Sequence, residues 1–283
     1  MMNYRLLGHS GLRVSEYSLG TMTFGEDWGW GSAKDEAKRI YDAYREAGGN
    51  FIDTANLYTN GASERILGEL LQGHRDEVVL ATKFTNAAPG KDPNAGGNHR
   101  KNMMQAVEAS LNRLKTGYID LYWLHIWDQI TPVEEVMRAF DDLVRQGKAL
   151  YIGVSEWRAE EIASALRIAD EMGLDRIVSN QPQYNMIWRV IEPEVVPLCE
   201  KEGIGQIVWS PIAQGALTGK YLPGEAPPAN SRATDSRGSV FIADYLSDDI
   251  LRRAQNLRSV ADEAGLTLSQ LAVAWTLQNP NVS

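Results

Sequence analysis

The sequence predicts an α/β protein, a parallel (β/α)8 barrel of the TIM type preceded by an N-terminal β-hairpin lid. From residue 17 onwards, short apolar runs alternate with amphipathic helical segments. This alternation indicates parallel strands, because each parallel crossover must be long enough to hold a helix. An open doubly wound sheet is the alternative, but no Gly-x-Gly-x-x-Gly motif follows the first strand, so the barrel is favoured. Residues 1–283 are expected to form one domain.

The first element is expected to be the hairpin. Residues 4–7 and 12–14 flank Gly8-His9-Ser10-Gly11, a sequence typical of a turn between two short strands. No helix follows the hairpin, so we interpret it as a cover on the barrel and not as one of its strands.

Seven barrel strands are then expected in chain order. Each is a short apolar run, and amphipathic helical patterns separate them. The strand candidates are residues 17–20, 50–53, 78–83, 119–125, 150–154, 176–180 and 205–209.

Start and stop signals support the helices between the strands. Ser32 precedes a helix that ends at Gly48-Gly49. Thr131 is predicted to be the N-cap of another helix, with Pro132 at its first position and Glu134 completing a capping box. Residues 267–270 (TLSQ) repeat the capping-box pattern before the last helix.

The C-terminal end departs from a whole barrel. After the helical pattern around residues 267–278, residues 279–283 lie where an eighth strand should begin. The eighth strand is therefore expected to be missing from this chain. Either the sequence is truncated, or the last unit of the barrel is supplied in another way. The long polar loop that follows the seventh strand, residues 223–238, is interpreted as a flap.

Composition excludes several classes of protein. With 43% hydrophobic and 23% charged residues the chain is ordinary globular protein. The net charge of −9 argues against binding to nucleic acid or to an anionic membrane surface. No apolar run approaches the ~18 residues of a membrane helix, so a cytoplasmic protein is expected. One cysteine, Cys199, and four histidines predict neither a disulfide nor a metal site, and a homo-oligomer is compatible with this composition.

Four titratable residues lie at or just after the predicted ends of strands, where (β/α)8 barrels carry their active sites. They are Asp53, Tyr58, Lys83 and His125. A tyrosine, with a usual pKa near 10, needs a cation such as Lys83 to become a good proton donor, and a buried Lys83 needs an anion such as Asp53. His125 can orient a carbonyl oxygen. None of the four is a nucleophile, and together they do not form a set of metal ligands. The group that attacks the carbonyl carbon should therefore be a hydride carrier.

At these residues the sequence resembles the aldo-keto reductase superfamily, from residue 4 to the end of the chain. NFIDTA (50–55), Tyr58 and GASE (61–64) are similar to the first conserved block of the superfamily. WSPI (209–212) and LTGK (217–220) are most similar to the branch that contains voltage-gated potassium-channel β subunits and their bacterial relatives. The resemblance implies that Asp53, Tyr58, Lys83 and His125 form the catalytic tetrad of the superfamily.

The resemblance also implies that NADP(H) is the cofactor. It implies that Ser155 and Gln181 bind the carboxamide of the nicotinamide and that Trp209 stacks on the ring. Glu156 stands where many members carry a carboxamide-binding Asn, so it is not counted among the cofactor residues. The choice of NADPH over NADH follows from the branch alone. The residues matching the pyrophosphate loop and the phosphate-clasping positions are Ser210, Pro211, Ile212, Gln214, Gly215, Lys220, Ser231 and Arg232.

The substrate pocket is expected to have aromatic walls. Trp28, Trp30, Trp127 and Trp188 follow strand candidates on the face where a carbonyl compound would enter, whereas Trp123 is interpreted as core. The predicted function is therefore an NADP-dependent aldo-keto reductase that acts on a small-molecule aldehyde or ketone. The alternative is a redox-sensing regulatory subunit with slow turnover, although the channel β subunits commonly carry Asn where this chain has His125. A carboxylate-pair hydrolase would need a second strand-end acid.

Overall fold

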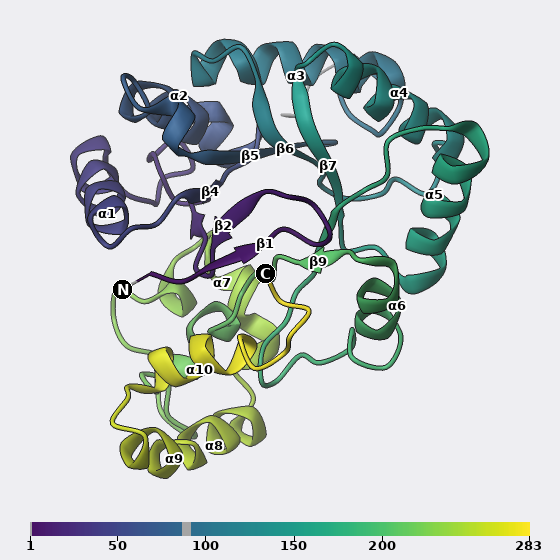
Figure 1. The fold of residues 1–283 in the computed structure, drawn as a ribbon. Coiled ribbons are helices and arrows are strands. Elements are labelled where there is room, and N and C mark those ends of the chain that lie inside the picture. The colour runs from purple at the N-terminus through teal and green to yellow at the C-terminus, as the bar shows by residue number, and fades with distance from the viewer. Residues whose placement is uncertain (1, 87–91) are drawn as a thin grey trace.

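A curled parallel sheet forms the centre of the computed structural model, which describes residues 2–86 and 92–283 (Figure 1). The sheet has seven strands in the order β3-β4-β5-β6-β7-β8-β9, so each strand pairs with the next along the chain. All seven predicted strands are present, and the predicted α/β barrel class is confirmed. The strands are β3 (Leu19–Gly20), β4 (Phe51–Asp53), β5 (Val79–Phe84), β6 (Ile119–Leu124), β7 (Ala149–Ser155), β8 (Ser179–Gln181) and β9 (Gly205–Gln206).

The predicted hairpin consists of the antiparallel strands β1 (Tyr4–Leu6) and β2 (Arg13–Ser15). Leu7 and Val14 are buried in one cluster with Phe51 and Val79, the first residues of β4 and β5. The hairpin therefore lies across the N-terminal ends of the strands, as Figure 1 shows in purple. It is a lid, as predicted, and it leaves the C-terminal ends of the strands free to hold a site.

Six helices surround the sheet on its outer face (Figure 1). Aromatic packing joins one of these helices to the strands: the Phe84 ring stacks on Tyr122 of the neighbouring strand with centroids 5.3 Å apart and meets Phe140 of that helix edge-on at 6.0 Å. The helices are α1 (Lys34–Glu46), α2 (Ala62–Leu70), α3 (Arg100–Leu114), α4 (Val133–Arg145), α5 (Ala159–Met172) and α6 (Val195–Glu202).

The predicted cap of α4 is wrong by one residue. Pro132 is the N-cap, and no side chain caps the helix. The hydroxyl of Thr131 instead donates to Asp128 (2.8 Å), which also accepts the backbone N–H of Thr131 (2.8 Å). Because the Thr131 hydroxyl is bound to Asp128, it is not used to cap the helix.

The C-terminal third adds short helices beyond the sheet. The predicted capping box of α10 is confirmed, since Thr267 and Gln270 exchange hydrogen bonds. Among the residues described, no helix combines the length and the apolar character that crossing a membrane requires. The helices are α7 (Ser239–Ile242), α8 (Asp248–Asn256), α9 (Arg258–Glu263) and α10 (Leu268–Thr276), and the 3-10 turns of the chain are η1 (Tyr58–Gly61), η2 (Arg75–Glu77), η3 (Ala213–Thr218), η4 (Arg232–Thr234) and η5 (Ala243–Tyr245).

The last residues lie beside β9, where the eighth strand was predicted to begin. Val282 forms a parallel bridge with Gln206. The N–H of Gln206 donates to the carbonyl of Asn281 (2.8 Å), and the N–H of Ser283 donates to the carbonyl of Gln206 (2.9 Å). Arg5 in the hairpin also donates to the carbonyl of Val282 (2.9 Å). The hairpin and this segment therefore support each other.

The segment interpreted as a flap, residues 223–238, reaches the loop that follows β3. The guanidinium of Arg237 donates to the carbonyl of Trp28, and that of Arg232 lies 5.7 Å from the centre of the Trp30 ring. These contacts join two segments that are about 200 residues apart in sequence and close one side of the mouth of the barrel.

Candidate active site

Lys83 organises the cluster of titratable residues at the C-terminal ends of the strands. It is the fifth residue of β5, and its side chain is completely buried. Its ammonium donates to the carboxylate of Asp53, to the carbonyl of Thr54 (2.8 Å) and to the hydroxyl of Tyr58 (3.1 Å). An ammonium has three protons to donate, so all three are used. The structure thus brings together three of the four residues predicted to be catalytic.

Pairing of adjacent strands and a strained turn position these groups. Asp53 ends β4, directly beside β5, and Tyr58 begins η1 in the loop that follows. Thr59 and Asn60 have φ values of 46° and 53°, in the left-handed region that non-glycine residues rarely adopt. The Thr59 hydroxyl donates to the carbonyl of Phe24 (2.6 Å) and fixes the turn. Such strain is typical of functional sites, and the turn places the Tyr58 hydroxyl within hydrogen-bond distance of Lys83.

Two further side chains hold the Asp53 carboxylate. The indole N–H of Trp123 donates to Oδ1 of Asp53 (3.0 Å), and the amide of Gln181 donates to the same oxygen (3.1 Å). Gly153 gives the Trp123 ring its space, because a Cβ there would lie 2.5 Å from the indole. Trp123 is core, as predicted, but it also orients Asp53, a role that sequence reasoning missed.

His125, the fourth predicted residue, follows β6 and lies edge-on to Tyr58 with ring centroids 5.9 Å apart. Its backbone N–H donates to the carbonyl of Phe84 (3.1 Å), which anchors it next to β5. Its Nδ1 is buried and has no hydrogen-bond partner in the described part of the chain. Burial, together with the charge of Lys83, lowers the pKa of His125 to about 3. The imidazole is therefore neutral near pH 7 and can form a hydrogen bond to a ligand.

Burial also governs the pKa of Tyr58. It raises that pKa above the usual value; the charge of Lys83 opposes this rise, and the charge of Asp53 adds to it. Lys83 thus acts on the pKa of Tyr58 in the expected direction, but burial outweighs it, and the expectation of a net lowered pKa is wrong. Burial lowers the pKa of Lys83, but Asp53 and Tyr58 outweigh that effect and raise it. Lys83 stays a cation, and Tyr58 keeps its proton until something accepts it.

A cavity of about 860 Å³ opens from Asp53, Tyr58 and His125 across the C-terminal ends of the strands. Lys83 lies behind Tyr58 and outside the lining. Ser231 does not line the cavity, but its hydroxyl is buried without a hydrogen-bond partner among the described residues; Pro211 also lies outside the lining. The predicted cofactor residues that do line the cavity are Ser155, Gln181, Trp209, Ser210, Ile212, Gln214, Gly215, Lys220 and Arg232.

The cavity wall formed by residues 210–215 is strained and tied to the flap. Ser210, Ala213 and Gln214 have left-handed φ values of 58°, 49° and 58°. Ser210 accepts hydrogen bonds from the backbone and side chain of Gln214 (3.1 and 3.0 Å), and Gln214 in turn accepts one from Arg232. The flap thus holds this wall in shape.

The charge of the cavity suits an anionic ligand. Lys220 and Arg232 line it, and neither forms an ion pair with a carboxylate of the described residues. Cations without carboxylate partners are suited to phosphate groups. Within residues 2–86 and 92–283, no group of three or more His, Cys, Asp or Glu is placed to hold a metal ion.

The four tryptophans predicted to line the substrate pocket have different surroundings. Trp28 lines the cavity, with its ring 6.5 Å from that of Tyr58. Trp30 packs behind Trp28 at 5.9 Å and is not in the wall. Trp127 packs on Trp157 at 5.5 Å and is absent from the lining, which corrects its expected place.

Trp188 is also outside the cavity wall, and its side chain is exposed. It lies in a turn closed by the Asn185 side chain, which accepts the backbone N–H of Trp188 (2.8 Å). The structure adds other lining residues to the wall. Thr21 and Met22 directly follow β3, so the rule on strand ends could have found them; Phe241 comes from α7 in the C-terminal third, and no sequence signal points to it.

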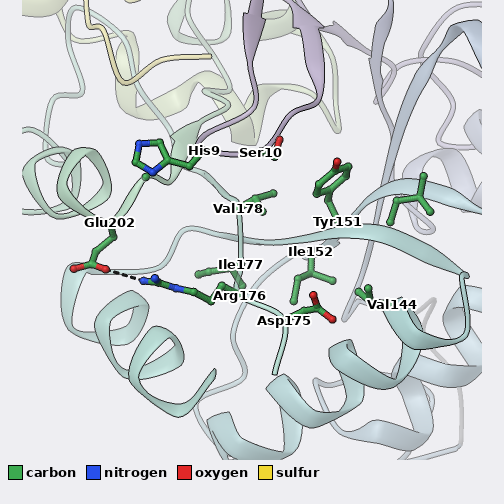
Figure 2. Close-up of a pocket in the computed structure, with 12 residues that line it drawn as sticks. His9, Ser10, Val144, Tyr151, Ile152, Asp175, Arg176, Ile177, Val178 and Glu202 are labelled. Atoms are coloured by element: carbon green, nitrogen blue, oxygen red, sulfur yellow. Dashed lines mark hydrogen bonds and ion pairs between the residues drawn. The ribbon is translucent and has the colours of Figure 1, made fainter. Parts of the chain in front are cut away.

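A second cavity, of about 370 Å³, lies at the opposite end of the strands (Figure 2). The hairpin turn contributes His9 and Ser10, and Val178 lines it just before β8. Its arginine, Arg176, is paired with Glu202 (2.7 Å). Because Glu202 neutralises this cation and no predicted site residue lines this cavity, the cavity around Tyr58 is the better candidate for the active site.

Comparison with known proteins shows which family this chain belongs to. Residues 17–283 match the model of the aldo/keto reductase family. A probable voltage-gated potassium channel subunit beta of Arabidopsis thaliana is 42% identical over 100% of this chain and 85% of that protein. A putative subunit of the same kind from Schizosaccharomyces pombe is 39% identical over 99% of the chain and 82% of its own length.

A relative named as an enzyme is also similar. The versiconal hemiacetal acetate reductase of Aspergillus parasiticus is 35% identical over 99% of this chain and 87% of that protein. The predicted likeness to the channel-subunit branch is confirmed, and the family supports an oxidoreductase. The family model and these matches, which cover 99–100% of the chain, establish that the chain belongs to the aldo/keto reductase family.

Proposed function

We propose that this protein reduces an aldehyde or ketone to an alcohol, with NADPH as the hydride source and Tyr58 as the proton donor. One observation carries the proposal: the Tyr58 hydroxyl, at the cavity surface, is hydrogen-bonded to a buried lysine that is paired with Asp53. That arrangement holds a proton where a carbonyl oxygen could receive it and holds a cation where the resulting phenolate would need one. The substrate is a small molecule, and Trp28 gives its pocket an aromatic wall.

Each residue of the tetrad has a distinct role in this proposal. When bound, the nicotinamide supplies the hydride for the carbonyl carbon. Tyr58 donates its proton to the carbonyl oxygen, and Lys83 stabilises the phenolate that remains. Asp53 keeps Lys83 charged. The His125 imidazole is neutral, so it orients the carbonyl oxygen as an uncharged hydrogen-bond donor.

The cavity residues fit a dinucleotide phosphate. Lys220 and Arg232 line the cavity and are available as cations. Trp209 would stack on the ring, Ser155 and Gln181 would face the carboxamide, and residues 210–215 would follow the pyrophosphate. The preference for NADPH over NADH rests on likeness to the branch.

The second candidate function is a redox-sensing subunit with slow turnover. It is favoured by the names of the plant and fission-yeast relatives. Both functions need the same cofactor cavity, and they differ in whether the tetrad turns over. The presence of His125 at the position where channel subunits commonly have Asn favours the enzyme.

The test combines cofactor binding with turnover. NADPH is titrated by calorimetry, and its oxidation is then followed with an aromatic aldehyde in excess, with the alcohol product quantified. Binding together with steady multiple turnovers supports the reductase. Binding with turnover that continues only slowly supports the sensor. If NADPH does not bind, both functions are wrong.

The pH profile of the reductase should lack a histidine titration. An unperturbed imidazole would change charge near pH 6.5. Because the pKa of His125 is lowered to about 3, that group stays neutral from pH 5 upwards and its contribution does not change. We expect kcat/KM at saturating NADPH to show no inflection between pH 6 and 7. An inflection there that disappears in His125→Gln would contradict this assignment.

A further inference from the structure

Glu156 is a strained residue that connects three strand ends at the cavity wall. It follows β7, and its φ of 60° is in the left-handed region. Its Oε1 accepts the indole N–H of Trp209 (2.7 Å) and the backbone N–H of Gln183 (2.6 Å). Its own backbone N–H donates to the carbonyl of Gln181 (3.3 Å). Unfavourable backbone geometry is thus maintained by contacts that place this carboxylate beside Trp209.

The charge of Glu156 has no counterpart in the described part of the chain. Glu156 lines the cavity with Trp209 and Gln181, and none of the ion pairs of residues 2–86 and 92–283 includes it. Burial raises the pKa of Glu156 above its usual value, and the hydrogen bonds from Trp209 and Gln183 oppose this rise without cancelling it. A neutral glutamine could accept the same two hydrogen bonds without placing an unpaired charge in the cavity wall. What the glutamate adds is therefore its negative charge.

We propose that Glu156 determines the redox preference of the cofactor site, favouring the oxidised over the reduced nicotinamide. This inference rests on the proposed function. The oxidised ring carries a positive charge and the reduced ring is neutral, so a carboxylate in the cavity wall attracts only the first. The phosphates are the same in both forms, so the repulsion between them and Glu156 cancels when the two affinities are compared.

The experiment compares the affinities of NADP⁺ and NADPH by calorimetry at pH 8. Glu156→Gln keeps the acceptor for Trp209 and removes the charge, whereas Glu156→Ala removes both. Glu160→Gln is the control for net charge, because Glu160 is exposed and pairs with Arg158 (2.8 Å) outside the cavity. We expect Glu156→Gln to weaken NADP⁺ about fivefold and to change NADPH less than about twofold, an effect typical of a partly screened charge pair. The control should leave both affinities unchanged.

The outcomes separate this inference from the function on which it rests. If the wild-type protein binds neither nucleotide, the proposed function fails. If it binds both and Glu156→Gln leaves the ratio of their dissociation constants unchanged, the inference alone is wrong. A purely structural role predicts that Glu156→Ala weakens both nucleotides equally with no change in ratio, and this result would also overturn the inference.

Discussion

Replacing Tyr58 with phenylalanine should lower kcat for carbonyl reduction by about a thousandfold, within the range that positioned acids contribute to catalysis. The substitution removes one oxygen, which lies 3.1 Å from the ammonium of Lys83. The ring remains and keeps its contacts with Trp28 and His125. Since the lost group acts on the reacting oxygen and not on the nucleotide, the affinity for NADPH should change by less than about twofold.

The measurement is single-turnover oxidation of bound NADPH in the presence of excess aldehyde, with calorimetric titration of NADPH on the same samples. Tyr118→Phe is the matched control. Its hydroxyl donates to Asp76 (2.9 Å), and neither residue lines the Tyr58 cavity. The control should retain wild-type turnover. Equal turnover in Tyr58→Phe and the wild-type protein would show that Tyr58 is not the acid.

The four residues could be predicted to lie close together because the order of the strands follows the order of the chain. In a parallel sheet whose strands follow the chain, the carboxyl ends of neighbouring strands meet at one edge. Asp53 ends β4, Lys83 lies near the end of β5 and His125 follows β6, so knowing the strands places all three. Tyr58 lies in the loop that directly follows β4, so the same rule on strand ends includes it.

Loop packing could not be predicted in the same way. Trp127 and Trp28 both follow strands, yet Trp127 packs onto Trp157 while Trp28 faces the cavity. The sequence places each residue after its strand but leaves open the direction in which the loop folds. Phe241 reaches the cavity only because the C-terminal segment returns over the mouth. Such contacts depend on tertiary packing between distant segments.

The net pKa of Tyr58 was mispredicted for a related reason. The sequence identifies the charges near the phenol but not the degree of burial, and burial is the largest influence on this group. The charge of Lys83 lowers the pKa of Tyr58, as predicted, but burial raises this pKa by more. In the proposed mechanism, Lys83 therefore contributes chiefly by stabilising the phenolate that remains once the proton has left.

Replacing Lys83 with methionine tests this view and should have the largest combined effect on stability and activity. Lys83 is completely buried and supplies hydrogen bonds to Asp53, Thr54 and Tyr58. Methionine would leave the Asp53 carboxylate buried with only the neutral donors of Trp123 and Gln181. Breaking a buried ion pair on one side typically costs about 3–5 kcal/mol of unfolding free energy. Turnover should fall at least as far as in Tyr58→Phe.

The double variant Lys83→Met/Asp53→Asn distinguishes the two roles of the lysine. Asparagine can still accept hydrogen bonds from Trp123 and Gln181 and carries no charge, so urea unfolding should show that much of the lost stability returns. Turnover should not return, because Tyr58 still lacks the cation that stabilises its phenolate. If the double variant recovered turnover along with stability, Lys83 would serve only as the counter-ion of Asp53, and the phenolate would have to be stabilised by another group.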